Sequence, residues 1–420
     1  MLAVGAGAVA WSVVGRQDTS AAMGEVRASS APSATASAPP AEDRLHAQVD
    51  AVLKVRASAV LAGKLPQFLA TVDPRNKKLR QQQQVLFGNL RKIGLRKLTY
   101  EREPKWAPEP QPQHGPSAHA FRVQMMVQIA GIDPAPRAVQ LGYTFVERGG
   151  RLLLVDDDDL NGSYGRGTYL EPWDLGAIEA IRKPGVLVVV PAGERANGER
   201  LAREARAAAP GVRAATRRAQ AAILVIAMAD RRSMDPEWQS GGHPAAAVAA
   251  YNLAPIAEDP RDMKVVGSRV VIHPDQRKKA GRLLLAHEFT HAAMAPLGFS
   301  APTWLVEGLA MYAEMQLAEQ RGYDVSEPRD ELLDEAIPQL DVLPIDGVFH
   351  GEYDEDSYGV SWILVEFLMD KYGQKKVNAL YADLAQAPED PTLREQLLRK
   401  HLKLSETAFV AAVKKYDGPS

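Results

Sequence analysis

The chain has 420 residues, enough for two domains, and it contains no cysteine. The lack of cysteine excludes disulfide bonds, a thiolate zinc site and a cysteine nucleophile. Its 50 basic and 52 acidic residues give a formal net charge of −2, so charge offers no reason to expect a nucleic acid partner. We therefore expect a peptide or protein partner rather than a nucleic acid.

The first residues form a short apolar run followed by a polar tract of low complexity. Residues 2–15 are apolar or small, but the run is shorter than the roughly twenty residues that span a bilayer and lacks the basic start of a signal peptide. We interpret residues 1–16 as an anchor or partial signal segment and residues 17–42 as a disordered Ser/Ala/Pro linker. This predicts a membrane-anchored protein on the extracytoplasmic side. The alternative is an Ala-rich tail.

Residues 43–159 are predicted to form helices first and strands afterwards. Helical apolar spacing marks 45–63 and 75–93, with a short helical turn between them. Four β-rich segments follow, at 95–103, 120–132, 138–149 and 151–156. This order is similar to the nuclear-transport-factor-like cone, in which helices pack on a curved antiparallel sheet around a pocket. The resemblance implies an N-terminal α+β cone-like domain, a fold that by itself assigns no function.

From Tyr169 the pattern indicates a second domain, residues 169–420. Apolar strands are predicted at 185–193, 221–229 and 265–274, and a helix at 199–219. After Glu319 the apolar spacing is helical, which predicts a helical C-terminal lobe.

The segment HEFTH, from His287 to His291, has the spacing of a metal site. On a helix, residues i and i+4 leave the same face one turn apart, so both imidazoles can bind one zinc ion. The preceding residues favour a helix, and Asp275 is a plausible N-cap, which predicts a helix of about five turns. Glu288 lies beside the two histidines.

A third ligand is expected in the following segment, WLVEGLAMY. Pro302 predicts a helix start there, with Glu307 near its beginning. A catalytic zinc site needs three protein ligands and an open position, and two His with one Glu is a common set. The alternative is structural, with ordinary polar histidines on an amphipathic helix and Glu307 as an acid favoured by the helix dipole.

Together, HEFTH and WLVEGLAMY resemble the gluzincin metallopeptidases, which carry HExxH on one helix and a ligand Glu on the next. The resemblance implies one zinc ion at His287, His291 and Glu307, with Glu288 as the general base for peptide hydrolysis. It also implies an α+β fold in which a small mixed sheet precedes the zinc helix and the C-terminal lobe is mostly helical.

In that family the edge strand of the sheet binds the substrate backbone by strand addition. The corresponding segment here is the strand before the zinc helix. The resemblance therefore implies substrate binding at Gly267, Ser268, Arg269 and Val270.

The resemblance also supplies an expected donor for the oxyanion of the transition state. In the related aminopeptidase branch, a Tyr in a Y-x-x-G/S context on the next helix has this role, and Tyr358 in SYGVSWILVEFL matches it. The structural alternative is a partly buried Tyr at a helix start. Tyr353 lies five residues earlier in the same acidic segment, EYDEDSY, and is the competing candidate for the oxyanion donor.

Two departures from the family pattern limit what the resemblance implies. Met311 stands where many gluzincins place an acid that orients a ligand histidine, so this role must fall elsewhere, for which Glu314 is one option. No Gly-x-Met-Glu-Asn signature for an N-terminal amine is present, so an endopeptidase is expected.

A second class of function stays open at this point. The chain could be a membrane-tethered ligand-binding or sensor protein with a non-catalytic peptidase-like scaffold. A scaffold has no need for the general base Glu288, and zinc content separates the two hypotheses. Because every expected catalytic residue follows Tyr169, we also expect that deletion of residues 43–157 leaves hydrolysis of a small peptide intact.

Overall fold

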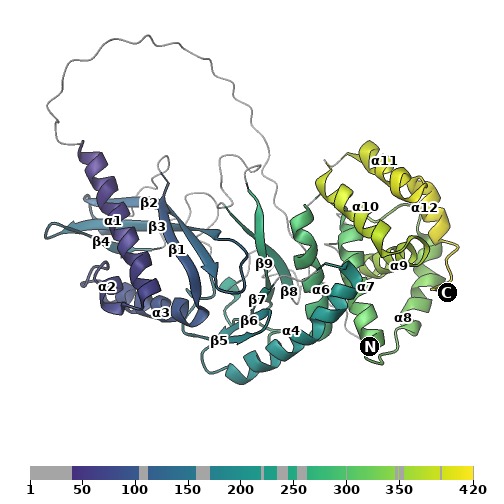
Figure 1. The fold of residues 1–420 in the computed structure, drawn as a ribbon, viewed down its shortest axis with the longest axis horizontal. Coiled ribbons are helices and arrows are strands. Elements are labelled where there is room, and N and C mark those ends of the chain that lie inside the picture. The colour runs from purple at the N-terminus through teal and green to yellow at the C-terminus, as the bar shows by residue number, and fades with distance from the viewer. Residues whose placement is uncertain are drawn as a thin grey trace, which may run out of the picture.

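The structure is a computed structural model in which ten stretches of the chain are described. They are residues 40–103, 112–157, 171–218, 222–233, 245–252, 263–298, 300–345, 349, 354–387 and 390–419. The predicted anchor, residues 1–16, and nearly all of the predicted linker therefore lie outside the described residues. Three parts follow one another along the long axis of the molecule: an N-terminal sheet with its helices, a second sheet, and a helical lobe (Figure 1).

The N-terminal part has helices first and strands afterwards, as predicted. Its helices are α1 (Ala41–Ala62), α2 (Leu65–Leu69) and α3 (Lys77–Ile93). Its strands are β1 (Leu95–Arg102), β2 (Ala118–Ile129), β3 (Arg137–Arg148) and β4 (Arg151–Asp156). A short 3-10 turn, Pro112–His114, lies between β1 and β2. The four strands form an antiparallel sheet in sequence order. The resemblance to a nuclear-transport-factor-like cone stays a prediction.

Local signals explain the ends of these helices. The side chain of Asn76 accepts a hydrogen bond from the backbone N–H of Leu79 and so caps α3. Gly63 and Gly94 follow α1 and α3 with φ of 71° and 77°, a left-handed conformation that glycine adopts without strain.

The second sheet is mixed, as the resemblance implied. Its strands are β5 (Ile178–Lys183), β6 (Val186–Pro191), β7 (Ile223–Ile226), β8 (Ala245–Tyr251) and β9 (Val265–Ile272). Their order in the sheet is β5-β6-β7-β9-β8. β6, β7 and β9 are parallel, and β5 and β8 are antiparallel to their neighbours. α4 (Arg195–Thr216) connects β6 to β7.

The expectation that the strand before the zinc helix forms the sheet edge is wrong. β9 lies between β7 and β8, and β7 pairs with it over Arg269–Val271. The edge strand beside β9 is β8, and its run of alanines has low β-propensity, so it was not predicted as a strand.

The C-terminal part is helical, as predicted. Its helices are α6 (Arg282–Met294), α7 (Thr303–Gln320), α8 (Ser326–Glu331), α9 (Asp354–Tyr372), α10 (Gln374–Gln386), α11 (Pro391–Leu402) and α12 (Glu406–Val413). This part also has short 3-10 turns at Ala295–Leu297 and Ile337–Gln339 and a π turn at Leu332–Ala336. Another 3-10 turn, Arg231–Ser233, lies between β7 and β8. Among the described residues, no helix is long and apolar enough to cross a membrane.

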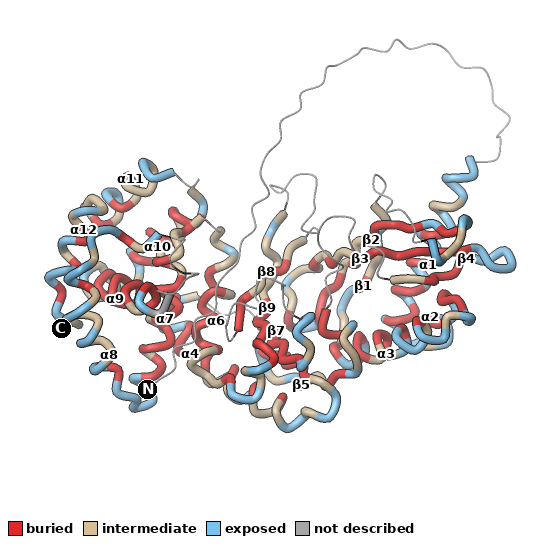
Figure 2. Tube along the Cα trace, turned by 180° about the vertical axis from the view of Figure 1, so that it is seen from behind, coloured by how far each residue is buried: buried red, intermediate tan, exposed pale blue. Residues whose placement is uncertain are grey.

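The two sheets share one hydrophobic core, which the predicted domain boundary did not anticipate. One cluster of buried side chains joins Phe68 and Val123 of the N-terminal part to Val189, Leu224 and Val271 of the second sheet. The opposite face of the second sheet packs against α4 and α6. Buried residues continue through both sheets (Figure 2). Deletion of residues 43–157 would expose this core to water, so it is not expected to leave an intact peptidase part.

Candidate metal centre

The HEFTH segment lies on α6, a shorter helix than expected. α6 begins at Arg282 after Gly281, and Asp275 lies in a preceding turn, where its carboxylate pairs with Arg231 at 2.5 Å. The prediction that Asp275 caps this helix is therefore wrong. α6 is buried on nearly all sides because it lies between the sheet, α4 and α7.

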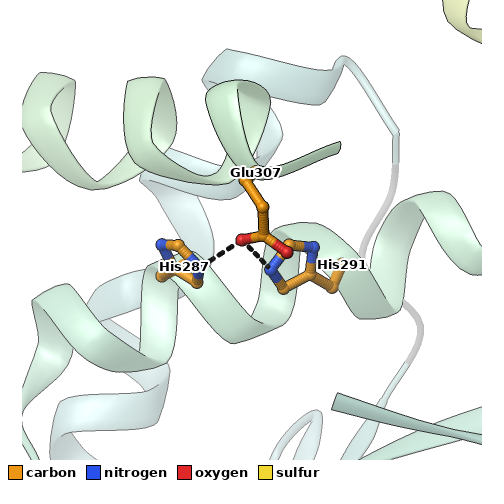
Figure 3. A group of neighbouring side chains, drawn as sticks. All are labelled: His287, His291 and Glu307. Atoms are coloured by element: carbon orange, nitrogen blue, oxygen red, sulfur yellow. Dashed lines mark hydrogen bonds and ion pairs between the residues drawn. The ribbon is translucent and has the colours of Figure 1, made fainter. Parts of the chain in front are cut away.

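The three expected ligands come together in the interior. α7 begins directly after Pro302, as predicted, and its first turns bring Glu307 over α6. Glu307 Oε2 lies 3.2 Å from His287 Nε2 and 3.3 Å from His291 Nε2 (Figure 3). One ligand atom from each residue lies within 4.8 Å of the others. The three residues are at most 5 % exposed.

The distances from Glu307 to the two histidines fit a tetrahedral zinc site. With zinc–nitrogen and zinc–oxygen bonds of about 2.0–2.1 Å, two ligand atoms of a tetrahedron lie about 3.3 Å apart. The side chain of His291 has no hydrogen-bond partner in the described part of the chain, although it is buried. Such buried, unsatisfied nitrogen atoms beside a carboxylate suit a metal ion.

The charges of the cluster also favour the binding of a cation. Burial alone would raise the pKa of Glu307, but the neighbouring His291 and His287 outweigh it and lower the pKa to about 2. Burial alone would lower the pKa of His287, but the carboxylates of Glu307 and Glu314 outweigh it and raise the pKa to about 10. The carboxylates thus stabilise positive charge at this point, in the form of a proton or a metal ion.

Glu314 is the second carboxylate beside His287. Its Oε2 lies 3.3 Å from His287 Nδ1, the ring nitrogen that points away from Glu307. Glu314 follows Glu307 by two turns of α7, so both carboxylates leave the same side of the helix. Glu314 therefore has the place of the orienting acid that Met311 cannot supply.

Glu288 is buried next to the ligands without being one of them. It is 0 % exposed, and neither carboxylate oxygen has a hydrogen-bond partner within the described residues. Burial raises the pKa of this carboxyl against the opposing effect of His287 and His291. A desolvated carboxylate beside a metal centre is suited to take a proton from water.

Tyr358 lies on α9, a helix that packs closely against the ligand helix α7. A Cβ added at Gly308 would lie 2.3 Å from the carbonyl oxygen of Ser361, so the two backbones approach each other directly after Glu307. Tyr358 lies one turn before Ser361, is 3 % exposed and packs edge-to-face on Phe349 at 5.4 Å. Its catalytic role stays a prediction, and Tyr353 lies outside the described residues.

The four residues expected to bind substrate are placed differently. Arg269 is buried and forms an ion pair with Glu171 at 2.7 Å. Gly267 lies against the Asp133–Pro134 turn of the N-terminal part, and the Ser268 hydroxyl is 3.4 Å from the carbonyl of Ala292. None of these contacts brings them to the metal ligands, and substrate binding at Gly267, Ser268, Arg269 and Val270 stays untested.

The sequence analysis did not single out Tyr381 on α10. Burial raises the pKa of its hydroxyl well above the usual value, and the negative charge of Glu307 adds to this effect. Tyr381 therefore lies near the cluster, although it follows Glu307 by several helices. No local pattern marks it, because its position depends on the packing of α10 in the lobe.

Two histidines and a glutamate on adjacent helices, with a buried Glu288 beside them, form a group that could hold a metal ion, and His2Glu is a ligand set of catalytic zinc sites. Residues 227–395 match the Peptidase MA superfamily. The match begins at the end of β7 and includes α6, α7 and α9, so every expected catalytic residue lies within it. It leaves the N-terminal part unassigned.

Three solved structures with a distant likeness are M1 zinc metallopeptidases. The first, a mutant from Deinococcus radiodurans, is 15% identical with a TM-score of 0.36 and covers 71% of this chain. A two-domain mutant bound to L-tryptophan is 14% identical with a TM-score of 0.35 over 72% of this chain. The Deinococcus radiodurans M1 zinc metallopeptidase itself is 15% identical with a TM-score of 0.34; the match covers 78% of this chain and 72% of that one.

These likenesses are too distant to assign an activity. The chain spans only 62% of the length of the first two structures. No curated protein matches this chain.

Proposed function

We propose that this protein is a zinc-dependent metallopeptidase that hydrolyses peptide bonds in a peptide or protein substrate. The observation that carries the proposal is the convergence of His287, His291 and Glu307 at zinc-ligand separations. The Peptidase MA match over the same residues supports it.

The roles of the residues follow from their positions. One zinc ion held by the three ligands would supply Lewis acidity, which lowers the pKa of water and polarises a carbonyl. Glu288 accepts the proton of the attacking water and delivers it to the leaving amine. Tyr358 donates its hydroxyl hydrogen to the developing oxyanion. Glu314 holds His287 in the orientation that presents Nε2 to the metal.

We further propose endopeptidase action, with the substrate backbone added to an edge strand. The second sheet ends in β5 on one side and β8 on the other, and β8 is the edge strand that pairs with β9, so β8 replaces Gly267, Ser268, Arg269 and Val270 as the place for strand addition.

The runner-up function is a membrane-tethered ligand-binding or sensor protein, and a cavity in the N-terminal part favours it. The cavity has a volume of about 350 Å³ and lies between α3 and the sheet. Leu79, Gln83, Met125 and Tyr143 are among its lining residues. This volume is in the range of small-molecule sites. Such a protein would not bind zinc, and it would not need Glu288 as a general base.

We keep the membrane anchor as a separate proposal. It rests on the apolar run at residues 2–15, and it places the peptidase on the extracytoplasmic side. Fractionation of cells that make the full chain, with a variant lacking residues 1–16, tests it. Equal recovery of both in the soluble fraction would exclude an anchor.

The metal content of ligand variants tests the proposed function. His287→Ala, His291→Ala and Glu307→Ala should each lose zinc and cleavage of an unstructured protein, because two ligands hold zinc poorly. His273→Ala removes a buried histidine outside the cluster and should retain both properties. Full zinc occupancy in Glu307→Ala would require another third ligand, and a wild-type chain without zinc would reject the proposal.

A further inference from the structure

Helix α4 carries a row of exposed arginines. Arg203, Arg206, Arg213 and Arg217 are all exposed, and no acidic residue lies on α4 between Arg206 and Arg217. At 100° per residue, Arg203, Arg206 and Arg213 fall within an arc of about 80° and extend over about 15 Å of the helix, and Arg217 follows directly at the C-cap with φ of 49°. We call these four residues the arginine stripe.

Glu199 lies one turn before Arg203 on the same side of α4, and its pKa is lowered chiefly by Lys183 and in part by the charge of Arg203, so only this end of the stripe lies beside a carboxylate of α4. Arg203, Arg206 and Arg213 have no ion pair within the described residues. The acids of α4 are already paired elsewhere: Glu204 lies 2.8 Å from Arg282, and Glu199 lies 2.9 Å from Lys183. The chain as a whole has a net charge of −2, so this positive surface is a local segregation of charge.

The stripe continues onto a second helix. Asn378 of α10 donates to the carbonyl of Thr216 at 2.7 Å, and Gln374 accepts from Arg217. This contact brings the start of α10, with the exposed Lys375 and Lys376, to the end of α4.

Helix stability does not account for the stripe. Cations near the C-terminal end of a helix are favoured by its dipole, which explains Arg213 and Arg217. Glu199, four residues earlier, favours Arg203, but neither effect explains Arg206 in the middle of α4. Like charges three or four residues apart repel each other, so the pattern lowers helix stability in the absence of a partner.

We propose that the arginine stripe binds an anionic phospholipid surface and orients the peptidase part on it. Guanidinium groups bind phosphate strongly, and several cations on one ridge add up on a charged plane. One face of α4 packs in the core against α6 and α7, and the helix lies on the outside of the second sheet (Figure 1), so the exposed arginines have a fixed position.

A nucleic acid is the weaker choice of anion. The exposed arc contains Pro210 and Ala214 but no aromatic residue on which bases stack. The apolar run at residues 2–15, for which the sequence predicts an anchor, would bring the same lipid surface within reach. The stripe proposal does not depend on the proposed hydrolysis.

Vesicle sedimentation of the full chain tests this surface. The probes are phosphatidylcholine vesicles with and without phosphatidylglycerol, at about 0.1 M salt, where the screening length is about 10 Å. The stripe variant combines Arg203→Gln, Arg206→Gln and Arg213→Gln. The matched control combines Arg44→Gln, Arg75→Gln and Arg96→Gln, which are exposed and without ion pairs within the described residues.

The stripe variant should lower partitioning onto phosphatidylglycerol vesicles about 100-fold, since each of the three cations contributes about fivefold. The control should bind like the wild type, and binding to pure phosphatidylcholine should not change. Equal partitioning of the stripe variant and the control would overturn the proposal. Stripe-dependent binding to a DNA duplex without a change in vesicle binding would overturn it as well.

Discussion

At the residue scale, His287, one of the proposed metal ligands, contacts two carboxylates through its two ring nitrogens. Nε2 faces Glu307 and Nδ1 faces Glu314. The i and i+4 spacing of the histidines is local, so the sequence predicted it. The role of Glu314 depends on how α7 crosses α6, and the sequence left it as one option.

Glu314→Ala should weaken zinc binding tenfold to 100-fold, because the partner that holds His287 in its orientation is lost. Zinc affinity is measured by competition with a chelator. Glu319→Ala, an exposed acid further along α7, is the control and should leave the affinity unchanged. Unchanged affinity in Glu314→Ala would mean that the metal site does not need this contact.

Tyr358→Phe should lower kcat and kcat/KM together by about 100- to 1,000-fold, with zinc content unchanged, because one oxyanion donor is removed. Stability should change by no more than about 1 kcal/mol. Tyr381→Phe is the matched comparison, since Tyr381 also lies near Glu307. A kinetic loss in Tyr381→Phe alone would transfer the role to Tyr381.

At the scale of elements, the existence of most helices and strands was predictable and their ends were less so. α6 begins seven residues after Asp275 because the intervening segment forms a turn that docks on α4, where Arg200 donates to the carbonyl of Ala280. β5 and β8 were missed because charged residues and alanines weaken their strand pattern. Pairing with neighbours across the sheet forms both strands.

Gly308→Ala tests the close crossing of α7 and α9. The new Cβ would meet the carbonyl oxygen of Ser361 at 2.3 Å, so the helices must separate next to Glu307. We expect a loss of about 1–3 kcal/mol in unfolding free energy and weaker zinc binding. Gly88→Ala, in α3 with no atom within 4 Å, should instead stabilise by about 0.5–1 kcal/mol. An unchanged zinc affinity in folded Gly308→Ala would show that the crossing does not position Glu307.

At the scale of the whole molecule, a buried carboxylate joins the two sheets. Glu171 lies 2.9 Å from Arg137 on β3 and 2.7 Å from Arg269 on β9. These arginines are 34 and 98 residues away in sequence, so no local pattern could reveal the contact. The same holds for the core that the sheets share, and this is why the sequence suggested a separable N-terminal domain.

The Glu171 contact predicts an acid-sensitive stability. Burial alone would raise the pKa of Glu171, but Arg137 and Arg269 lower it from 4.5 to about 2. The contact therefore stabilises the fold fully above about pH 4.5, and this stabilisation is lost as the pH falls toward 2. At pH 7 it amounts to roughly 3 kcal/mol.

Glu171→Gln should lose this amount in urea unfolding at neutral pH, and its difference from the wild type should shrink as the pH falls below about 4.5. Glu147→Gln, an exposed acid on β3, should behave like the wild type. A Glu171→Gln chain of wild-type stability at neutral pH would contradict the account of the contact.

The measurement that tests the central claim most directly compares the wild-type chain with Glu288→Gln. Both are assayed for bound zinc and for cleavage of an unstructured protein. Because Glu288 is a base and not a ligand, the variant should keep one zinc ion per chain and lose about two to four orders of magnitude in kcat. A variant with wild-type turnover, or a wild-type chain that binds no zinc, would contradict the assignment of this site as a zinc peptidase.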